Sequence, residues 1–275
     1  MRVDLNVQEI INELYDTITA KCAKQKEIFD KYNLVPKFCI INANPDDVGS
    51  KIYLKNKINL LEKYGIEVEH CILKDNYSIV ANKIHQCNRD RIPVILQLPL
   101  GENCAYHTQT LLDAIYTSLD VDGLSNMHDR LPITSSMLYY VIKRIEKKTG
   151  PLNGIFLRGN GKTTNKALIQ KLLTERGDIF ISNSKTTRKQ EELYIRNSDL
   201  IISATGIPNS LRNSESLKIM DKILISPTVL KVDGKWVNDI DDELRKPWNY
   251  THNITGAIGK LTLIGLCDRI QKYYL

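Results

Sequence analysis

A regular alternation of short apolar strands with helical segments, starting at Lys37, constrains the fold of this chain most strongly. Strands that alternate with helices form parallel sheets, because each helix carries the chain back across the sheet. A helix over residues 7–32 is predicted before this alternation begins. The first cycle predicts a strand at 37–43, a helix that Ser50 caps and that ends at Lys63, a strand at 66–73, a helix through about Cys87 and a strand at 93–98.

A second alternating unit is predicted after the segment at 124–132. Its elements are helices at 135–148, 165–175 and 189–196, strands at 154–157, 178–182, 200–204 and 223–225, and a last helix at 260–275. The predicted fold class is therefore α/β, with two parallel-sheet units. Ligands of such sheets bind beyond the carboxyl ends of the strands, so the loops after the strands are candidate sites.

The composition argues against several other classes of protein. The 42% hydrophobic residues supply a substantial core, but no apolar run approaches the roughly 20 residues of a membrane span. The net charge of +6 is spread along the chain without an arginine-rich arm, so we expect no nucleic-acid partner. The six cysteines lack C-x-x-C spacing and a nearby His pair, which argues against a zinc site. Without a signal peptide, we expect free thiols and a cytoplasmic protein.

Three places carry side chains suited to chemistry. Tyr53 and Lys57 are four residues apart, so they share a helix face, where they either serve a cleft or are simply solvated. Gln97 interrupts an apolar strand, so it either points into a cleft or is satisfied by the backbone. Asp120 and Asp122 stand two residues apart in a turn, where they either bind a donor-rich ligand or a metal or make only local bonds.

Taken together, these places resemble a known enzyme family. In the bifunctional methylenetetrahydrofolate dehydrogenase/methenyltetrahydrofolate cyclohydrolase family, Ser-x-x-Tyr-x-x-x-Lys, Val-Gln-x-Pro-Leu-Pro and Asp-Val-Asp-Gly-Phe patterns occur in this order. The chain has Ser50, Tyr53 and Lys57, then LQLPLG at 96–101, then DVDGL at 120–124. The resemblance continues through LPITSS at 131–136, NSKTT at 183–187, ATGIP at 204–208 and TGAIGKLT at 255–262.

The resemblance implies a two-lobed architecture and a reaction in two steps. A folate-binding catalytic lobe would span 1–124, with the helix at 260–275 packing back onto it. A Rossmann-like dinucleotide-binding lobe would span 125–259 and form a homodimer. Hydride transfer from 5,10-methylenetetrahydrofolate to NADP or NAD would precede hydrolysis of the methenyl cation to 10-formyltetrahydrofolate, and no metal is required.

The resemblance also assigns roles to individual residues. Lys57 would transfer protons during hydrolysis, and burial together with Gln97 would hold its amine near the neutral form. Gln97 would also orient Lys57. Tyr53 would pack against the aminobenzoate and Asp122 would accept hydrogen bonds from the pterin. Gly256 and Thr262 would also contact the substrate. The cofactor contacts would be Arg158, Gly159, Asn160, Ser184, Thr205 and Gly206.

The stretch FLRGNGKTTNKA at 156–167 is the candidate phosphate-binding loop. Gly161, Lys162 and Thr163 resemble the end of a P-loop, whose lysine reaches phosphate and whose threonine holds magnesium. However, Phe156 stands where a P-loop needs its first glycine, and no strand ending in Asp follows. In the family, the same segment is the cofactor loop, with a Gly-Arg-Ser…Val-Gly-x-Pro pattern.

This cofactor loop departs from the family pattern. Thr164 replaces a glycine that would let backbone N–H groups approach the pyrophosphate, and Lys166 replaces a proline. Asn183 replaces a histidine, and LISPTV at 224–229 replaces an Asp-Val-Gly stretch. We therefore expect dinucleotide binding to be weak or absent. Two alternatives to the bifunctional enzyme follow: a cyclohydrolase-only descendant, and a non-catalytic folate-binding or scaffold relative, which would have no use for Lys57.

Overall fold

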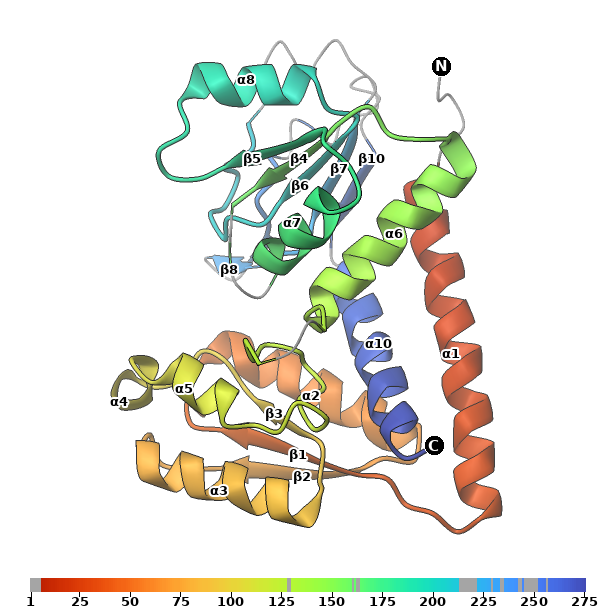
Figure 1. The fold of residues 1–275 in the computed structure, drawn as a ribbon, viewed down its shortest axis with the longest axis vertical. Helices are drawn as coiled ribbons and strands as arrows, with labels where there is room; N and C mark the ends of the chain where they lie inside the picture. Colours follow the sequence, from red (N-terminus) through yellow and green to blue (C-terminus); the bar gives the residue numbers. More distant parts are fainter. Residues whose placement is uncertain are drawn as a thin grey trace. The chain divides into compact units, whose positions relative to one another are not determined.

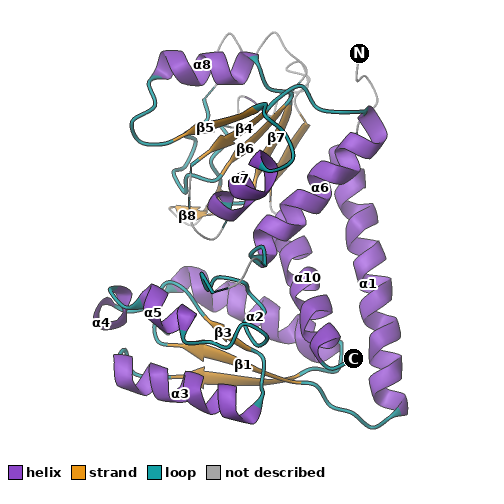
Figure 2. Cartoon of the chain, viewed as in Figure 1, coloured by secondary structure: helices purple, strands orange, loops and turns teal. Residues whose placement is uncertain are grey.

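The computed structural model describes residues 6–127, 130–159, 161, 164–212, 222–228, 230–232, 235–241, 244, 252–255 and 257–275. The chain divides into two compact units, each with its own parallel sheet (Figures 1 and 2), which confirms the predicted fold class. The three-stranded unit comprises Asp16–Ile133 and Leu263–Leu275, and the five-stranded unit comprises Met1–Tyr15 and Thr134–Thr262. The assignment of 1–124 to folate and of 125–259 to a dinucleotide stays a prediction.

Two long helices contribute residues to both units. They are α1 (Val7–Lys31), close to the predicted span, and α10 (Ala257–Tyr273), which begins earlier than expected. No helix in the described part of the chain combines the length and the apolar composition that crossing a bilayer requires.

The three-stranded unit is a parallel sheet with strand order β2-β1-β3. Its elements are β1 (Lys37–Asn42), α2 (Val48–Lys63), β2 (Glu67–Ile72), α3 (Tyr77–Asp90), β3 (Val94–Leu96), α4 (Glu102–Ala105) and α5 (Thr108–Asp113). β2 lies on one side of β1 and β3 on the other, so the connection from β1 to β2 and the connection from β2 to β3 cross the sheet in opposite directions. Two right-handed crossovers therefore place α2 and α3 on opposite faces of the sheet, as Figure 1 shows.

The start of α2 differs from the prediction, because Asp47 and not Ser50 caps the helix. The Asp47 carboxylate accepts a hydrogen bond from the Ser50 backbone N–H over 2.7 Å, as an N-cap carboxylate does. Ser50 lies inside the helix, and its buried hydroxyl donates to the Leu98 carbonyl over 3.3 Å. The serine therefore ties α2 to the segment that follows β3.

The apolar core of the three-stranded unit lies between the sheet and α3. Alternate side chains of a strand point to the same face, and Cys39, Ile41 and Leu96 share the face that α3 covers. Ile84 and Cys87 of α3 complete this layer, with α5 packed beside them. Full burial of one such aliphatic side chain stabilises the fold by about 1.5–3 kcal/mol. This packing holds the carboxyl edge of the sheet, where the candidate site lies.

The five-stranded unit has the parallel strand order β10-β7-β6-β4-β5. Its helices are α6 (Ile133–Thr149), α7 (Asn165–Leu173) and α8 (Arg188–Arg196), and its sheet contains β4 (Ile155–Arg158), β5 (Ile179–Ser182), β6 (Leu200–Ser203), β7 (Ile223–Ser226) and β10 (His252–Thr255). A separate antiparallel pair joins β8 (Leu230–Val232) to β9 (Lys235–Val237). The order of the first three sheet strands is β5-β4-β6, which matches the order β2-β1-β3 in the other unit.

Candidate active site

In the three-stranded unit, the order of strands reverses between β1 and β3. A ligand of an open parallel sheet binds at such a switch point, outside the carboxyl ends of the strands. Gln97 follows β3 directly, and its backbone N–H donates to the Ile41 carbonyl over 2.8 Å. Asp120 forms a parallel bridge with Val94, which brings Asp122 to the same edge. The topology thus brings together two of the three places that the sequence singles out.

Lys57 of α2 reaches this edge as a buried amine. Its side chain is only 4% exposed, and Nζ donates to Gln97 Oε1 over 3.0 Å. The same Nζ lies 5.0 Å from the centre of the Tyr53 ring, within cation–π range. Burial lowers the pKa of Lys57 below the usual lysine value, although the Asp122 carboxylate opposes this effect. Burial thus shifts the amine in the direction that suits a proton-transfer residue.

The Gln97 amide has its orientation set from both ends. Its NH₂ group donates to the Leu98 carbonyl over 2.8 Å, so its oxygen is the atom that faces Lys57. The backbone thus satisfies one end of the amide and Lys57 the other, while the expectation that Gln97 points into a cleft stays a prediction. Since the amine donates one hydrogen bond along a fixed direction, its lone pair and its other hydrogens have defined directions too.

The two carboxylates of the DVDG turn have different roles. Asp120 is buried and accepts hydrogen bonds from the backbone N–H groups of Gly123 and Ser125, over 2.8 and 2.9 Å, so it builds the turn. Asp122 is half-buried and makes no side-chain hydrogen bond to the described residues. Burial raises the pKa of Asp122, while the charge of Lys57 acts to lower it. Asp122 thus retains acceptor capacity at the edge where Lys57 lies.

Arg269 of α10 is a supporting residue that the sequence patterns miss. Its guanidinium donates to the carbonyl of Val121 over 3.1 Å and to that of Leu131 over 2.7 Å, which pins the turn that carries Asp122. Gly123 in this turn has φ +77°, and a Cβ there would lie 3.0 Å from the Leu131 oxygen. Only glycine fits this conformation and space. The D-G pair signals the turn, but no local pattern links position 269 to it.

Tyr53 completes the group of side chains around Lys57. Its ring is half-buried on the same face of α2, one helical turn before Lys57. Burial raises the pKa of its phenol, so the hydroxyl stays protonated at neutral pH. Tyr53 therefore offers a flat apolar surface and a neutral hydroxyl.

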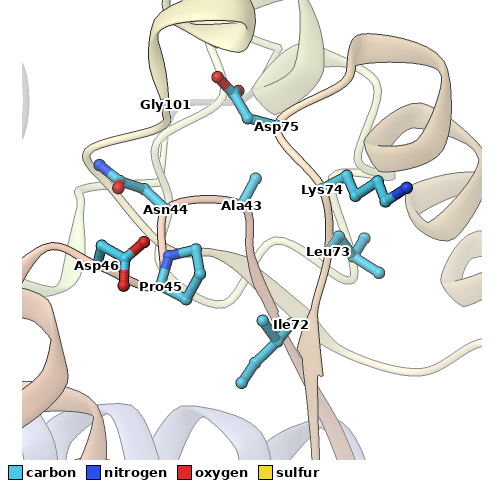
Figure 3. A pocket seen from close by; sticks show the side chains of 9 residues that line it. All are labelled: Ala43, Asn44, Pro45, Asp46, Ile72, Leu73, Lys74, Asp75 and Gly101. Carbon is cyan, nitrogen blue, oxygen red and sulfur yellow. The ribbon is translucent and has the colours of Figure 1, made fainter.

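A cavity of about 470 Å³ opens at the carboxyl ends of β1 and β2 (Figure 3). It is lined by residues 43–46 and 72–75 and by Gly101, and not by Lys57, Gln97 or Asp122. Asp75 at its rim accepts hydrogen bonds from the backbone N–H groups of Asn103 and Cys104, so its carboxylate holds α4 in place. The cavity therefore borders the loop that leads into α2 without including the Lys57 group.

In the five-stranded unit, the strand order reverses between β4 and β6. Four residues predicted to bind the cofactor lie here: Arg158 and Gly159 at the end of β4, and Thr205 and Gly206 after β6. Gly159 has φ +83°, and a Cβ there would lie 2.7 Å from the Ala204 oxygen. The glycine is therefore required by the close approach of the chain's own β6 loop. It is not evidence of space kept for a pyrophosphate.

The polar groups at this second switch point are engaged with one another. The Arg158 guanidinium donates to Glu191 over 3.0 Å and to the Ser210 hydroxyl over 2.7 Å, and the side chain is only 14% exposed. The Asn165 amide donates to the carbonyls of Arg158 and Gly159, which closes the turn before α7. A bound phosphate would have to compete with these contacts. The described residues thus fit a dinucleotide poorly at the phosphate position.

The β6 loop is held in the same way. Asp239 is buried and accepts hydrogen bonds from the backbone N–H of Thr205 over 2.5 Å, from the Thr205 hydroxyl over 2.8 Å and from the Ser203 hydroxyl over 3.1 Å. The Thr205 hydroxyl also contacts that of Ser210 over 2.9 Å. Thr205 therefore serves the internal network of the loop.

The remaining predicted site residues are placed as follows. Ser184 is exposed in the loop after β5. Thr262 is buried in α10, and its hydroxyl donates to the Ile258 carbonyl over 2.8 Å. Asn160 and Gly256 lie outside the described residues, as do Lys162 and Thr163 of the candidate phosphate loop. The side-chain group around Lys57 is therefore the better defined of the two candidate sites.

Several known proteins are similar to this chain. Residues 5–122 match the family model described as tetrahydrofolate dehydrogenase/cyclohydrolase, catalytic domain. The matched segment contains Tyr53, Lys57, Gln97 and Asp122. The bifunctional protein FolD of Campylobacter jejuni strain RM1221 is 27% identical over 191 residues, which span 65% of this chain and 65% of that protein. The FolD protein of Lactobacillus gasseri is 27% identical over 268 residues, or 90% of each chain.

Solved structures share the whole fold. The crystal structure of the bifunctional dehydrogenase/cyclohydrolase FolD from Campylobacter jejuni superposes with a TM-score of 0.80 at 23% identity, covering 95% of each chain. At this identity the likeness establishes the architecture of the chain, and the chemistry has to be argued from its residues.

Proposed function

We propose that this chain acts in one-carbon folate metabolism, chiefly as a methenyltetrahydrofolate cyclohydrolase of the tetrahydrofolate dehydrogenase/cyclohydrolase family, whose catalytic-domain model matches residues 5–122. The observation that carries the proposal is the buried Lys57 amine, 3.0 Å from Gln97 Oε1. Burial of an amine is costly and lowers its pKa. A scaffold protein or a simple folate carrier would gain nothing from this arrangement, whereas proton transfer requires it.

In the proposed hydrolysis, Lys57 moves a proton twice. Its neutral amine accepts a proton from water as the water oxygen bonds to the amidinium carbon of 5,10-methenyltetrahydrofolate. The resulting ammonium returns a proton to N5 as the bond between that carbon and N5 breaks. The hydroxyl proton of the intermediate passes to solvent, and 10-formyltetrahydrofolate is released. Gln97 holds the amine through the Oε1 contact in both states of protonation.

Tyr53 and Asp122 would position the substrate. Asp122 retains free acceptor oxygens, which suit the N–H donors of a pterin ring. The half-buried Tyr53 ring suits stacking against an aminobenzoate group. Gly256 and Thr262 stay proposed substrate contacts from the family pattern.

The second proposed activity, oxidation of 5,10-methylenetetrahydrofolate, is expected to be much weaker. A bound NADP or NAD would supply the hydride acceptor, through contacts with Arg158, Gly159, Asn160, Ser184, Thr205 and Gly206. The internal pairing of Arg158 and the closure of the loop by Asn165 argue against tight binding. The family pattern also suggests a cytoplasmic location and a homodimer.

An assay of the purified chain tests the proposed function. We expect steady hydrolysis of 5,10-methenyltetrahydrofolate, followed by its loss of absorbance, above the rate in buffer. Folate binding without hydrolysis would instead support the non-catalytic alternative.

A further inference from the structure

Two cysteines and a glutamate of the three-stranded unit meet on the sheet face that α3 covers. Cys39 Sγ on β1 lies 3.9 Å from Cys71 Sγ on β2. Cys71 Sγ in turn lies 3.2 Å from Glu69 Oε1. The ligand atoms of Cys39, Glu69 and Cys71 all lie within 4.8 Å of one another. The register explains the meeting, because β1 and β2 pair Cys39 with Glu69 and Ile41 with Cys71. Residues two apart on a strand share a face, so all three side chains point the same way.

Cys87 of α3 is buried in the same apolar layer as Cys39. It does not join the group, because among the described residues only the ligand atoms of Cys39, Cys71 and Glu69 all lie within 4.8 Å of one another. Two sulfur atoms and one carboxylate oxygen thus converge from two strands.

The spacing of the sulfur atoms matches a tetrahedral metal centre. A zinc ion with Zn–S bonds of about 2.3 Å and tetrahedral angles holds its sulfur ligands roughly 3.8 Å apart. The observed separation of Cys39 Sγ and Cys71 Sγ is 3.9 Å. A disulfide would need the sulfurs at about 2.05 Å, which requires the strands or side chains to move. The geometry is therefore already that of metal ligands.

We propose that Cys39, Cys71 and Glu69 form a binding site for a thiophilic divalent cation of the Zn²⁺ type, with water in the fourth position. Thiolates together with one carboxylate disfavour Mg²⁺ and Ca²⁺, which prefer all-oxygen ligands. The site is separate from the Lys57 group and is independent of the proposed folate chemistry. Bound metal would join β1 to β2, so it would stabilise the three-stranded unit.

Lys83 supplies the charge balance and Glu69 the route of entry. The Lys83 ammonium pairs with Glu69 Oε1 over 2.6 Å, and its charge would offset part of the negative charge of the thiolates. The Glu69 carboxylate is 53% exposed, whereas Cys39 is fully buried. A cation can therefore reach Glu69 and half-buried Cys71 from solvent before it contacts the inner thiol of Cys39.

The chain contains a matched control pair of cysteines. Cys22 and Cys267 are also buried, and the Cys22 thiol donates to the Ile264 carbonyl over 3.9 Å. In the described part of the chain, however, they belong to no group of three potential ligands. Replacement of Cys22 removes one buried thiol without touching the proposed site.

Metal titration of the full-length protein tests the proposal. The reduced, chelator-treated wild-type chain, Cys71→Ala, Glu69→Gln and Cys22→Ala would each be titrated with Zn²⁺ against a chromophoric chelator, and with Co²⁺ to record thiolate charge-transfer absorption. We expect one Zn²⁺ per wild-type chain and an unchanged Cys22→Ala variant. Loss of Cys71 should weaken the affinity by more than the about 10- to 100-fold that an outer partner contributes.

The titration remains decisive even if a variant folds poorly. Circular dichroism would identify such a variant, and the wild-type chain alone must show stoichiometric metal and cobalt–thiolate absorption. A wild-type chain that binds no metal at micromolar concentrations contradicts the proposal. Equal Zn²⁺ affinity in folded Cys71→Ala and in Cys22→Ala contradicts it as well.

Discussion

The two switch points of this molecule share a topology and differ in what their side chains do. In the three-stranded unit, Lys57, Gln97 and Asp122 face one edge, and Asp122 keeps acceptor capacity for a ligand. In the five-stranded unit, Arg158 is paired with Glu191 and Ser210 within the fold. The same strand order can therefore carry polar side chains that are free to bind a ligand, or polar side chains whose hydrogen bonds are all made within the fold. Topology locates a site, and the remaining hydrogen-bonding capacity decides whether it can work.

The largest expected effect is the loss of cyclohydrolase activity when Lys57 of the three-stranded unit is replaced. We predict that Lys57→Ala lowers cyclohydrolase turnover by about 10²- to 10⁴-fold, the usual contribution of a positioned proton-transfer group. The fold should persist, because alanine is a good helix former. Lys55→Ala, at an exposed position of the same helix, is the matched control and should retain activity. Wild-type turnover by Lys57→Ala would rule out the assigned role.

The second-largest expected effect concerns the Asp122 carboxylate, which keeps acceptor capacity at the same edge of the three-stranded sheet. Asp122→Ala should weaken the binding of a folate analogue by about tenfold or more, because donors of the pterin lose a charged partner. Calorimetric titration of the analogue measures this change. Unchanged affinity would show that Asp122, like Asp120, belongs only to the turn.

A third change tests whether Arg158 is committed to the fold. Arg158→Ala leaves the half-buried Glu191 carboxylate without its partner, while Ser210 keeps its contact with Thr205, so we expect a loss of about 1–3 kcal/mol in the free energy of unfolding. Denaturant titration gives this value. Arg188, whose side chain is 88% exposed in its pair with Glu192, is the control, and Arg188→Ala should cost less than about 1 kcal/mol. Equal costs would indicate that Arg158 is free to serve a ligand.

The smallest expected effect is the pH dependence of stability that Lys57 causes. Its pKa is lowered in the native state, so between that pKa and the unfolded value of about 10.4 the unfolded state binds more protons. Stability from this group therefore rises as the pH rises toward 10.4 and is lost as the pH falls. Lys57→Met removes the effect, so its gain in Tm over the wild type should be larger at pH 7 than at pH 10. A gain that does not change with pH would contradict the lowered pKa.

The sequence predicts the strands and long helices well because their apolar periodicity is local. It does not predict α4, α5 or the β8–β9 pair, which are too short to show a period. The predicted N-cap of α2, Ser50, is wrong by three residues. Asp47 and Ser50 are both good N-cap residues, and only the fold decides between them.

The site depends more on contacts between distant residues. The Lys57–Gln97 hydrogen bond is foreseen from the family pattern, whereas the Arg269 clamp on the DVDG turn has no local signal. The same holds for Cys39, Cys71 and Glu69. Their spacing matches no metal motif, and only the parallel register of β1 and β2 brings them together.

One paired measurement tests the difference between the two switch points most directly. On a single preparation, calorimetry with NAD, NADP and ATP would be combined with assays of methenyltetrahydrofolate hydrolysis and methylenetetrahydrofolate oxidation. We predict clear hydrolysis, with neither dinucleotide bound at micromolar concentrations and little oxidation. Micromolar binding of either dinucleotide, with hydride transfer from methylenetetrahydrofolate, would contradict the account and make both sites functional.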